Sequence, residues 1–189
     1  MATARRLLLV RHCSSSGPRP DDPLSTAGLR EAEALADFLS GRGIDAAYAS
    51  AYRRAQQSIE PFAVRAGLTV RVDPRLNERT LSSGPGGEWR SEPNWREVVR
   101  DSFDDPDLRA PGGETPREVL HRAWAALNEL LDGGYSLPVA ATHGQLMALV
   151  LSSLDPGFGF KGWESLTNPD VYLLEGTGDG RMTFKRLWA

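Results

Sequence analysis

The chain has 189 residues, which is the size of one domain or of one domain carrying an insertion. Its 40% hydrophobic and 25% charged residues are ordinary for a globular protein, so the composition excludes the disordered and fibrous classes. A net charge of -3 excludes nucleic-acid binding through a global positive field, although a local arginine cluster can still hold an anion.

From the N-terminal region of this sequence we expect no export or membrane signal. Its apolar run, residues 7–10, is shorter than the hydrophobic region of a signal peptide, and no stretch approaches a membrane span of about 20 residues. Cys13 is the only cysteine, so an internal disulfide is excluded, and the three histidines lack the spacing of a zinc motif. We therefore expect a cytoplasmic protein with no membrane or nucleic-acid partner and no metal; a homo-oligomer remains compatible with the sequence.

The first part of the chain alternates apolar runs with helical patterns. Residues 6–12 form a short apolar run that is typical of a strand buried on both faces, and the run ends in Arg11 and His12. Helical spacing with Ser25 as N-cap predicts a helix over 25–39. The next predicted elements are a strand at 44–49, a helix at about 51–66 that Pro61 should kink or interrupt, and a strand at 68–72.

The pattern loosens between residues 73 and 113, where we expect an insertion or lid containing one helix near 94–103. Beyond it, the strongest helical pattern covers 115–131, with Thr115 as N-cap. A strand at 138–142 then ends at His143 and Gly144, and a helix follows at 145–154. Strands at 171–174 and 182–187 flank a Gly-rich turn and predict a terminal hairpin.

This order of elements predicts an α/β fold with a mostly parallel central sheet and helices on both faces. We expect a single domain over residues 1–189, with the insertion at about 73–113. Ligands of such sheets bind at the carboxyl ends of the strands. Arg11 and His12 end one predicted strand, and His143 and Gly144 follow another, so we expect these residues to share one site.

Two phosphate chemistries are compatible with the segment that follows the first strand. Cys13 is separated by five residues from Arg19, which resembles the phosphate loop of cysteine-dependent phosphatases, with the thiolate as nucleophile. That loop needs backbone N–H groups aimed at the anion and a helix directly behind it. Pro18 removes one N–H, and Pro20 and Pro23 delay the helix, so this interpretation is the weaker one.

In the second interpretation His12 is the nucleophile, and further motifs occur in order along the chain. They are Ser50-Ala51-Tyr52-Arg53-Arg54-Ala55, Leu76-Asn77-Glu78-Arg79 and Ala141-Thr142-His143-Gly144, with Pro23-Leu24-Ser25-Thr26-Ala27-Gly28 and Pro111-Gly112-Gly113-Glu114-Thr115 between them. Over residues 7–144 the sequence resembles the histidine phosphatase superfamily, the phosphoglycerate mutase-like proteins. The resemblance implies their three-layer sandwich.

The resemblance also implies a role for each matching residue. His12 would become phosphorylated, Glu78 would be the general acid, and His143 would be a second imidazole on the transferring group. The residues that would bind phosphate are Arg11, Arg54, Ser15 and Gly144. The implied activity is metal-independent hydrolysis of a small phosphomonoester through a phosphohistidine, with no cofactor.

Departures from the family pattern leave alternatives open. Cys13 stands where the family usually has Gly, and Pro18 stands where it commonly has Asn, so the substrate is not identified. A cofactor-dependent phosphoglycerate mutase and a non-catalytic phosphate-binding domain are the other candidates. Glu88 and Glu114 compete with Glu78 as the acid, whereas His121 falls on the polar side of its helix and receives no role.

Overall fold

The computed structural model describes residues 5–81 and 94–188. The strands are β1 (Arg6–Arg11), β2 (Ala46–Ala49), β3 (Val70–Val72), β4 (Pro138–Thr142), β5 (Asp170–Gly176) and β6 (Met182–Arg186). The helices are α1 (Thr26–Leu39), α2 (Arg53–Ala66), α3 (Trp95–Asp101), α4 (Pro116–Asp132), α5 (Gly144–Leu154) and α6 (Gly159–Ser165), and a 3-10 turn, η1, covers Pro74–Leu76.

The described strands form one sheet in the order β3-β2-β4-β1-β5-β6. The first four strands of that order are parallel, whereas β5 and β6 run antiparallel and form the predicted terminal hairpin. Strand β1 is central and pairs with β4 in a register that sets Arg11 opposite Thr142. The prediction of a mostly parallel α/β sheet is confirmed.

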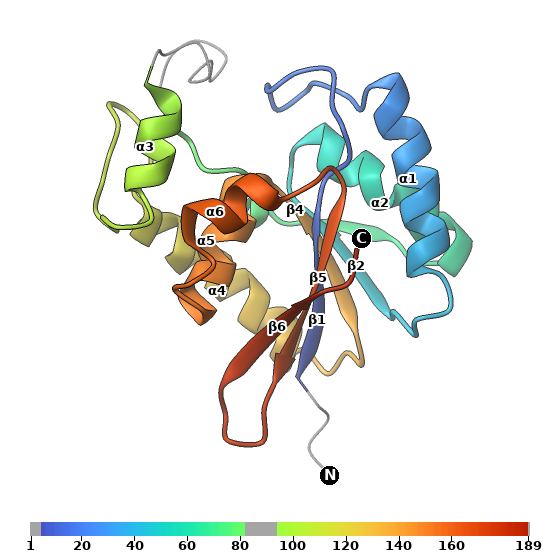
Figure 1. The fold of residues 1–189 in the computed structure, drawn as a ribbon. Helices are drawn as coiled ribbons and strands as arrows, with labels where there is room; N and C mark the ends of the chain where they lie inside the picture. Colours follow the sequence, from blue (N-terminus) through green and yellow to red (C-terminus); the bar gives the residue numbers. More distant parts are fainter. Residues whose placement is uncertain (1–4, 82–93, 189) are drawn as a thin grey trace.

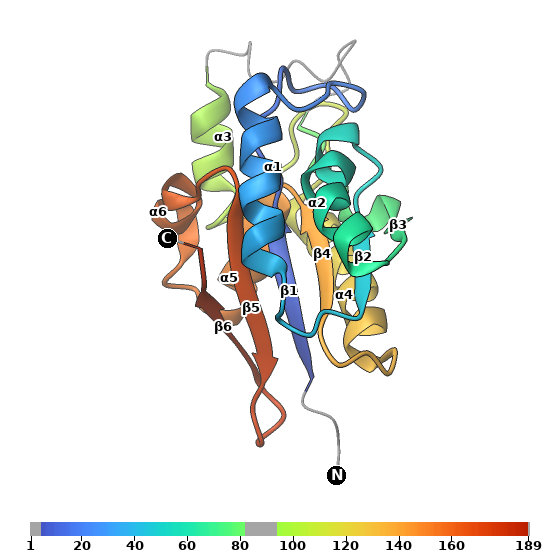
Figure 2. The ribbon, with the colours of Figure 1, turned by 90° about the vertical axis from the view of Figure 1, so that its right-hand side faces the viewer.

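Alternating side chains of β1 build a core on each face of the sheet. Leu7 and Leu9 pack in a cluster with residues of α4 and α5, whereas Leu8 and Val10 pack with residues of α1 and α2. Figure 1 shows the resulting three layers, with α1 and α2 on one side of the sheet and α4, α5 and α6 on the other; Figure 2 gives the view from the side of α1 and α2.

Local sequence signals explain where the main helices begin. The Ser25 hydroxyl accepts a hydrogen bond from Gly28 N at 3.0 Å and caps α1. Thr115 and Glu118 form a capping box at the start of α4, whose buried face includes Val119, Ala123 and Leu127. Helix α5 differs because its first eight residues are all buried, which an apolar sequence on every side of the helix permits.

Two expectations about helices were incomplete or wrong. Pro61 does not interrupt α2, which runs unbroken from Arg53 to Ala66. Packing of Ile59, Phe62 and Ala63 into the core outweighs the one backbone hydrogen bond that a proline removes. Helix α6 was not predicted because it is short and contains two glycines, Gly159 and Gly162, which disfavour helix in isolation.

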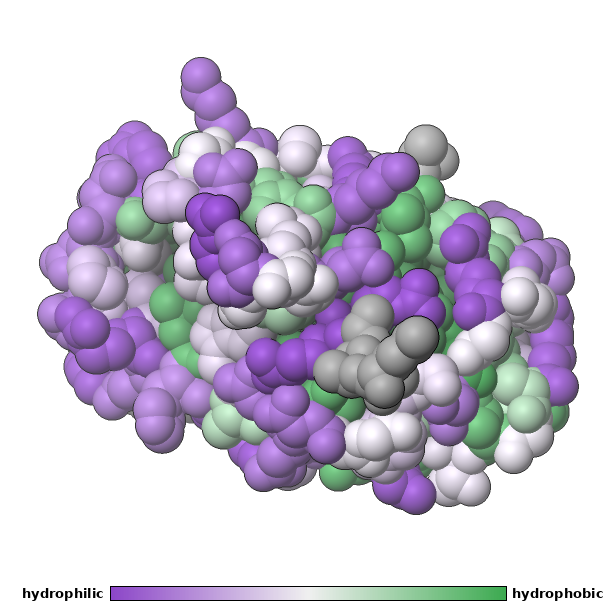
Figure 3. All heavy atoms as spheres, turned by 90° about the horizontal axis from the view of Figure 1, so that it is seen from below, coloured by the Kyte–Doolittle hydropathy of each residue, from purple (hydrophilic) through white to green (hydrophobic). Residues whose placement is uncertain are grey.

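The parallel strands point their carboxyl ends to one end of the molecule. The opposite end, seen in Figure 3, presents hydrophilic residues over much of its surface. None of the helices within the described ranges is long and apolar enough to cross a membrane. The helix predicted near 94–103 is α3, and the rest of the lid prediction falls partly on residues 82–93, which lie outside the described residues.

Candidate active site

The ends of β1 and β4 bring the two predicted histidines together. His12 follows β1 and donates its backbone N–H to the Thr142 carbonyl at 3.0 Å, one residue before His143. The two imidazole rings lie 5.0 Å apart, centroid to centroid, at an interplanar angle of 61°. The structure thus brings the two strand ends together, because neighbouring parallel strands end at the same edge of the sheet.

Hydrogen bonds define the protonation of the His12 ring. Its Nδ1 lies 2.7 Å from the Cys13 carbonyl oxygen, and because a carbonyl only accepts, Nδ1 carries the proton. The other ring nitrogen, Nε2, accepts from Arg54 Nε at 3.3 Å. A ring that donates through Nδ1 and accepts through Nε2 is the neutral tautomer. His12 therefore holds a nucleophilic lone pair on Nε2 beside a guanidinium.

His143 is fully buried and is also neutral. Burial, reinforced by the positive charge of the Arg54 guanidinium, holds the pKa of His143 well below its usual 6.5. Its Nε2 lies 2.7 Å from the Ser50 hydroxyl oxygen, and that oxygen accepts from Tyr52 N at 3.2 Å. The Ser50 hydroxyl has its hydrogen available to donate to Nε2, and in the tautomer that accepts this bond the ring proton lies on Nδ1.

The Nδ1 atom of His143 has no hydrogen-bond partner among the residues that the structure describes. A buried polar atom in this condition is costly unless a ligand satisfies it. In the tautomer that accepts from Ser50, Nδ1–H is a donor available to an oxygen atom of a bound anion.

The two predicted phosphate-binding arginines are held by backbone carbonyls. Arg11 donates through Nη1 to the Leu166 and Thr167 carbonyls, at 2.9 and 3.4 Å. Arg54 is only 4% exposed and donates through Nη1 to the Pro18 and Arg19 carbonyls, at 3.2 and 2.8 Å. Both guanidinium groups are thus fixed in place, as rigid recognition of a phosphoryl group requires.

Glu78 reaches the same end of the sheet from the segment after η1. One carboxylate oxygen, Oε1, accepts from Arg79 N at 2.9 Å and Leu146 N at 3.0 Å, and Oε2 accepts from Gln145 N at 3.1 Å. The carboxyl group of Glu78 thus lies at the N-terminus of α5. Its donors in α5, Gln145 N and Leu146 N, are two and three residues after His143.

The competing glutamates do not occupy that position. Glu114 is bound to the guanidinium of Arg122 through both carboxylate oxygens, at 2.8 and 2.9 Å. Glu88 lies outside the described residues. Among the described glutamates that the sequence suggested, Glu78 is therefore the one beside the histidine pair.

Ser15 and Gly144 have different surroundings. The Ser15 hydroxyl donates to the Gly17 carbonyl at 2.9 Å, so its hydrogen serves the loop itself, and its role in phosphate binding stays a prediction. Gly144 lies against Arg11, because a Cβ at this position would come within 3.2 Å of the guanidinium carbon. The glycine therefore leaves the space that the Arg11 side chain occupies.

The structure contradicts the cysteine-dependent alternative. The side chain of Cys13 is fully buried, and burial raises the pKa of its thiol to about 12. A nucleophilic cysteine needs a thiolate at neutral pH and access to its substrate. The side chains of these two adjacent residues point in different directions. His12 faces the site, whereas Cys13 packs in the core between the sheet and the helices α1 and α2.

Sequence reasoning overlooked three residues around the histidines. Ser50 and Tyr52 belong to a motif that the sequence did show, but no role was assigned to them. Tyr52 packs edge-on to His143 at 4.8 Å between ring centroids, and the Arg54 guanidinium lies 4.8 Å from the centre of the Tyr52 ring. Asn168 lies in the loop after α6, and its side chain donates a hydrogen bond of 2.6 Å to the His12 carbonyl. The sequence contains no pattern that predicts this contact.

Two further predictions from the sequence concern His121 and metal binding. His121 is exposed on α4, as its place on the polar side of the predicted helix implied. Within residues 5–81 and 94–188, no group of three or more His, Cys, Asp or Glu residues is arranged to hold a metal ion.

Comparison with known proteins agrees with the fold and with the motifs. Residues 7–187 match the model of the histidine phosphatase superfamily (branch 1), so the chain belongs to this superfamily. A probable phosphoglycerate mutase of Yersinia pestis is 31% identical over 139 residues, which are 71% of this chain and 64% of that protein. The chain thus spans less than two thirds of the length of this curated relative.

Solved structures of similar proteins match along nearly the whole chain. A protein described as mycobacterial hydrolase 1 is 26% identical with a TM-score of 0.77, and the match covers 98% of each chain. A mycobacterial glucosyl-3-phosphoglycerate phosphatase is 26% identical with a TM-score of 0.76 and 97% of each chain covered. Further structures of that phosphatase contain VO3 or inorganic phosphate.

Proposed function

We propose that this protein hydrolyses small phosphomonoesters through a phosphohistidine formed on Nε2 of His12. The observation that carries the proposal is the hydrogen bond from His12 Nδ1 to the Cys13 carbonyl, because it leaves Nε2 with its lone pair beside Arg54. An imidazole must be neutral to attack phosphorus, and this tautomer meets that requirement without the loss of a proton.

Three fixed donors support the transfer of a phosphoryl group. They are Arg11, Arg54 and the Nδ1–H of His143, which come from the ends of different elements. Arg54 and His143 lie against the His12 ring, and Arg11 is the residue directly before His12. A phosphoryl group in transfer distributes negative charge over three equatorial oxygens. Donors that are already positioned stabilise that charge without reorganisation.

The reaction proceeds in two steps under this proposal. His12 Nε2 attacks phosphorus, the bond from phosphorus to the ester oxygen breaks, and Glu78 transfers a proton to that departing oxygen. Water then attacks the phosphohistidine, the N–P bond breaks, and the Glu78 carboxylate accepts a proton from the water. His12 and Glu78 are thereby restored, and neither step needs a cofactor or a metal.

A phosphoglycerate mutase is the second candidate. The 31% identity to a probable phosphoglycerate mutase favours it. Two observations favour hydrolysis: that relative is matched over only 64% of its length, whereas the glucosyl-3-phosphoglycerate phosphatase is matched over 97% of both chains. A small phosphorylated substrate is common to both candidates.

The experiment that tests the proposal is hydrolysis of 4-nitrophenyl phosphate in excess EDTA by the wild type and by His12→Ala and Cys13→Ala. We expect the wild type to turn over, Cys13→Ala to keep activity of the same order, and His12→Ala to lose at least about a hundredfold in kcat. Activity that survives in His12→Ala, or that depends on a metal, would overturn the proposal.

Two further measurements separate the other candidates. Acid quenching after incubation with the substrate should preserve no phosphohistidine, whereas base quenching should preserve it in the wild type and not in His12→Ala. Interconversion of phosphoglycerates that exceeds their hydrolysis would assign the mutase function instead. Binding of vanadate without turnover of any phosphomonoester would assign the non-catalytic phosphate-binding domain.

A further inference from the structure

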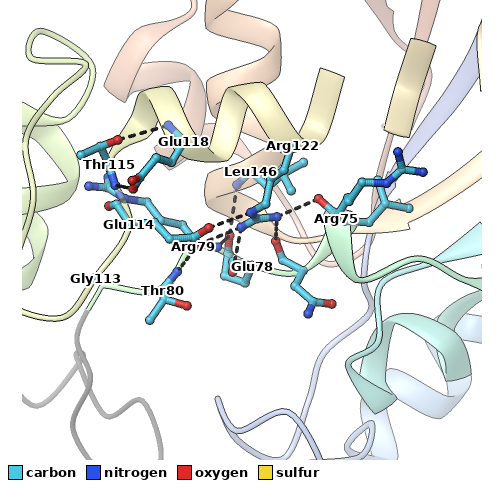
Figure 4. A network of polar contacts seen from close by, with 12 residues as sticks. Arg75, Glu78, Arg79, Thr80, Gly113, Glu114, Thr115, Glu118, Arg122 and Leu146 are labelled. Atoms are coloured by element: carbon cyan, nitrogen blue, oxygen red, sulfur yellow. Dashed lines mark hydrogen bonds and ion pairs between the residues drawn. The ribbon is translucent and has the colours of Figure 1, made fainter. Parts of the chain in front are cut away.

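A single arginine of α4 binds the backbone of the segment that carries Glu78. Arg122 of α4 donates through Nη1 to the Arg75 and Asn77 carbonyls, both at 2.7 Å, and through Nη2 to the Glu78 carbonyl at 3.3 Å. Figure 4 shows this guanidinium between the backbone of residues 75–78 and the Glu114 carboxylate. One side chain thus satisfies three carbonyls of the chain that leads to the general acid.

The guanidinium is itself fixed by Glu114. Arg122 Nε contacts Oε1 at 2.8 Å, and Nη2 contacts Oε2 at 2.9 Å, which is the paired geometry that restricts an arginine most. The two side chains are only 19% and 27% exposed. Glu114 Oε2 also accepts from Thr80 N at 2.9 Å, so the carboxylate is tied to the residues directly after Glu78.

Further contacts of this segment come from α4, where Glu129 pairs with the Arg75 side chain, from the start of α5, which binds the Glu78 carboxylate, and from the catalytic end of the sheet. The Thr142 hydroxyl donates to the Leu76 carbonyl at 2.8 Å, and Ala51 N donates to the Asn77 side-chain oxygen at 2.8 Å. These bonds hold the segment on the side of β2 and β4. Arg122 differs from these contacts because it binds three backbone carbonyls of the segment from the side of α4.

We propose that Arg122, oriented by Glu114, is a positioning residue that holds the Glu78 carboxyl group where it can protonate the departing oxygen. The proposal rests on the proposed function, in which Glu78 is the general acid. Arg122 touches neither the substrate nor the reacting atoms; it acts through the backbone of residues 75–78. A displacement of about 1 Å in a catalytic group is enough to slow a reaction strongly.

The dependence of the reaction on its leaving group tests this role. Aryl phosphates of similar shape, 4-nitrophenyl and 4-methylphenyl phosphate, differ in how much the departing oxygen needs a proton. For Arg122→Met we expect kcat/KM to fall about tenfold or more for the 4-methylphenyl ester and about twofold for the 4-nitrophenyl ester. Because kcat/KM extends only through the first phosphoryl transfer, slow hydrolysis of the phosphohistidine does not mask the effect.

Two other variants keep the test informative if Arg122→Met folds poorly. Glu114→Gln keeps Arg122 but weakens the hydrogen bonds that orient its guanidinium. We expect kcat/KM to fall again more for the 4-methylphenyl ester than for the 4-nitrophenyl ester, but by less than in Arg122→Met. Arg122→Lys keeps the positive charge but cannot form the paired hydrogen bonds of a guanidinium. The larger loss of kcat/KM on the 4-methylphenyl ester should therefore persist in this variant. Arg117→Met is the matched control, since Arg117 lies on the same helix with its side chain exposed and paired to Asp107.

The double variant Glu78→Gln/Arg122→Met distinguishes positioning from a general structural effect. Once the acid is removed, Arg122 has nothing to position, so the double variant should be no slower than Glu78→Gln on the 4-methylphenyl ester. Equal losses on both esters, no loss in Arg122→Met and Glu114→Gln, or additive losses in the double variant would overturn the proposal. Activity of His12→Ala on 4-nitrophenyl phosphate equal to that of the wild type is a different result, and it would overturn the proposed function itself.

Discussion

Gly144 is the residue where the absence of a side chain has the most direct consequence for the site. A Cβ there would lie 3.2 Å from the carbon and two nitrogens of the Arg11 guanidinium, closer than an ordinary contact. The Leu166 carbonyl holds that guanidinium from the other side at 2.9 Å. Arg11 would therefore have to shift, and with it one of the proposed phosphate donors.

For Gly144→Ala we expect kcat/KM on 4-nitrophenyl phosphate to fall about tenfold, because a charge-assisted hydrogen bond is weakened by the shift. The loss should come with little change in the free energy of unfolding. Gly178→Ala is the control, since a Cβ there meets no atom within 4 Å. Wild-type kinetics in Gly144→Ala would show that Arg11 adapts without loss.

The burial of His143 predicts how stability depends on pH. Its pKa is well below 6.5 in the folded protein, because burial first and neighbouring positive charges second oppose protonation. Below pH 6.5 the unfolded chain binds a proton that the folded protein does not. His143 therefore lowers the stability as the pH falls below 6.5, by at most about 1.4 kcal/mol per pH unit, and has no such effect above it.

The measurement is the free energy of unfolding of the wild type and of His143→Gln, by urea denaturation between about pH 5 and 8. Glutamine does not titrate, so the difference between the two proteins should stay constant in the upper part of the range and change in favour of the variant in the lower part. Parallel profiles throughout would mean that His143 takes up its proton in the folded state.

Among the elements, α4 connects the core to the segment that carries Glu78. It buries an apolar face against the sheet and presents Arg122 on another side. Its start is defined by Thr115, whose hydroxyl accepts from Glu118 N at 3.1 Å while the Glu118 carboxylate accepts from Thr115 N at 2.9 Å. The capping box therefore determines where α4 begins, directly after Glu114.

Thr115→Ala should lower the free energy of unfolding by about 1 kcal/mol, because one N–H at the helix start loses its acceptor. Chemical denaturation measures this loss. Thr115→Ser, which keeps the hydroxyl, is the matched control and should lose much less. A variant as stable as the wild type would indicate that water replaces the cap at no cost.

A second arginine explains how the region after residue 101 is attached. Arg79 is 1% exposed, and burial lowers the pKa of its guanidinium to about 10. It donates to the Glu114 and Leu108 carbonyls, both at 3.0 Å, and to the Ser102 hydroxyl at 2.5 Å. Arg79 therefore has a structural function in the Leu-Asn-Glu-Arg motif, beside a neighbour proposed to be catalytic.

At the scale of the whole molecule, the candidate site joins segments that are distant in the sequence. His12 follows β1, Arg54 begins α2, Glu78 follows η1, and His143 follows β4. A bound anion that contacts donors from several of these segments stabilises the entire fold, because it binds the folded state alone.

We therefore expect vanadate to raise the Tm in a concentration-dependent manner, with about 2.7 kcal/mol of added stability at a hundredfold excess over its Kd. Chloride at the same ionic strength should give no comparable shift. Arg54→Met should lose most of the vanadate shift. An equal shift in the variant would place the anion at another site.

The sequence by itself determined the sheet and the residues that meet at its edge. Apolar runs that end in Arg11 and His12, and that precede His143 and Gly144, predict two parallel strands, and side chains that follow parallel strands lie at the same end of the sheet. Helix starts were equally local, because Ser25 and Thr115 cap the residues next to them in the chain.

Only the tertiary structure decided what depends on direction and on distant partners. His12 and Cys13 are adjacent in sequence, but the fold turns one toward the site and buries the other, and this burial excludes the thiolate. The contact of Arg54 with Nε2 of His12, the contact of Asn168 with the His12 carbonyl and the bonds of Arg122 to residues 75–78 depend on segments that are distant in the chain. Pro61 remained helical for the same reason, because packing against the core outweighed a local preference.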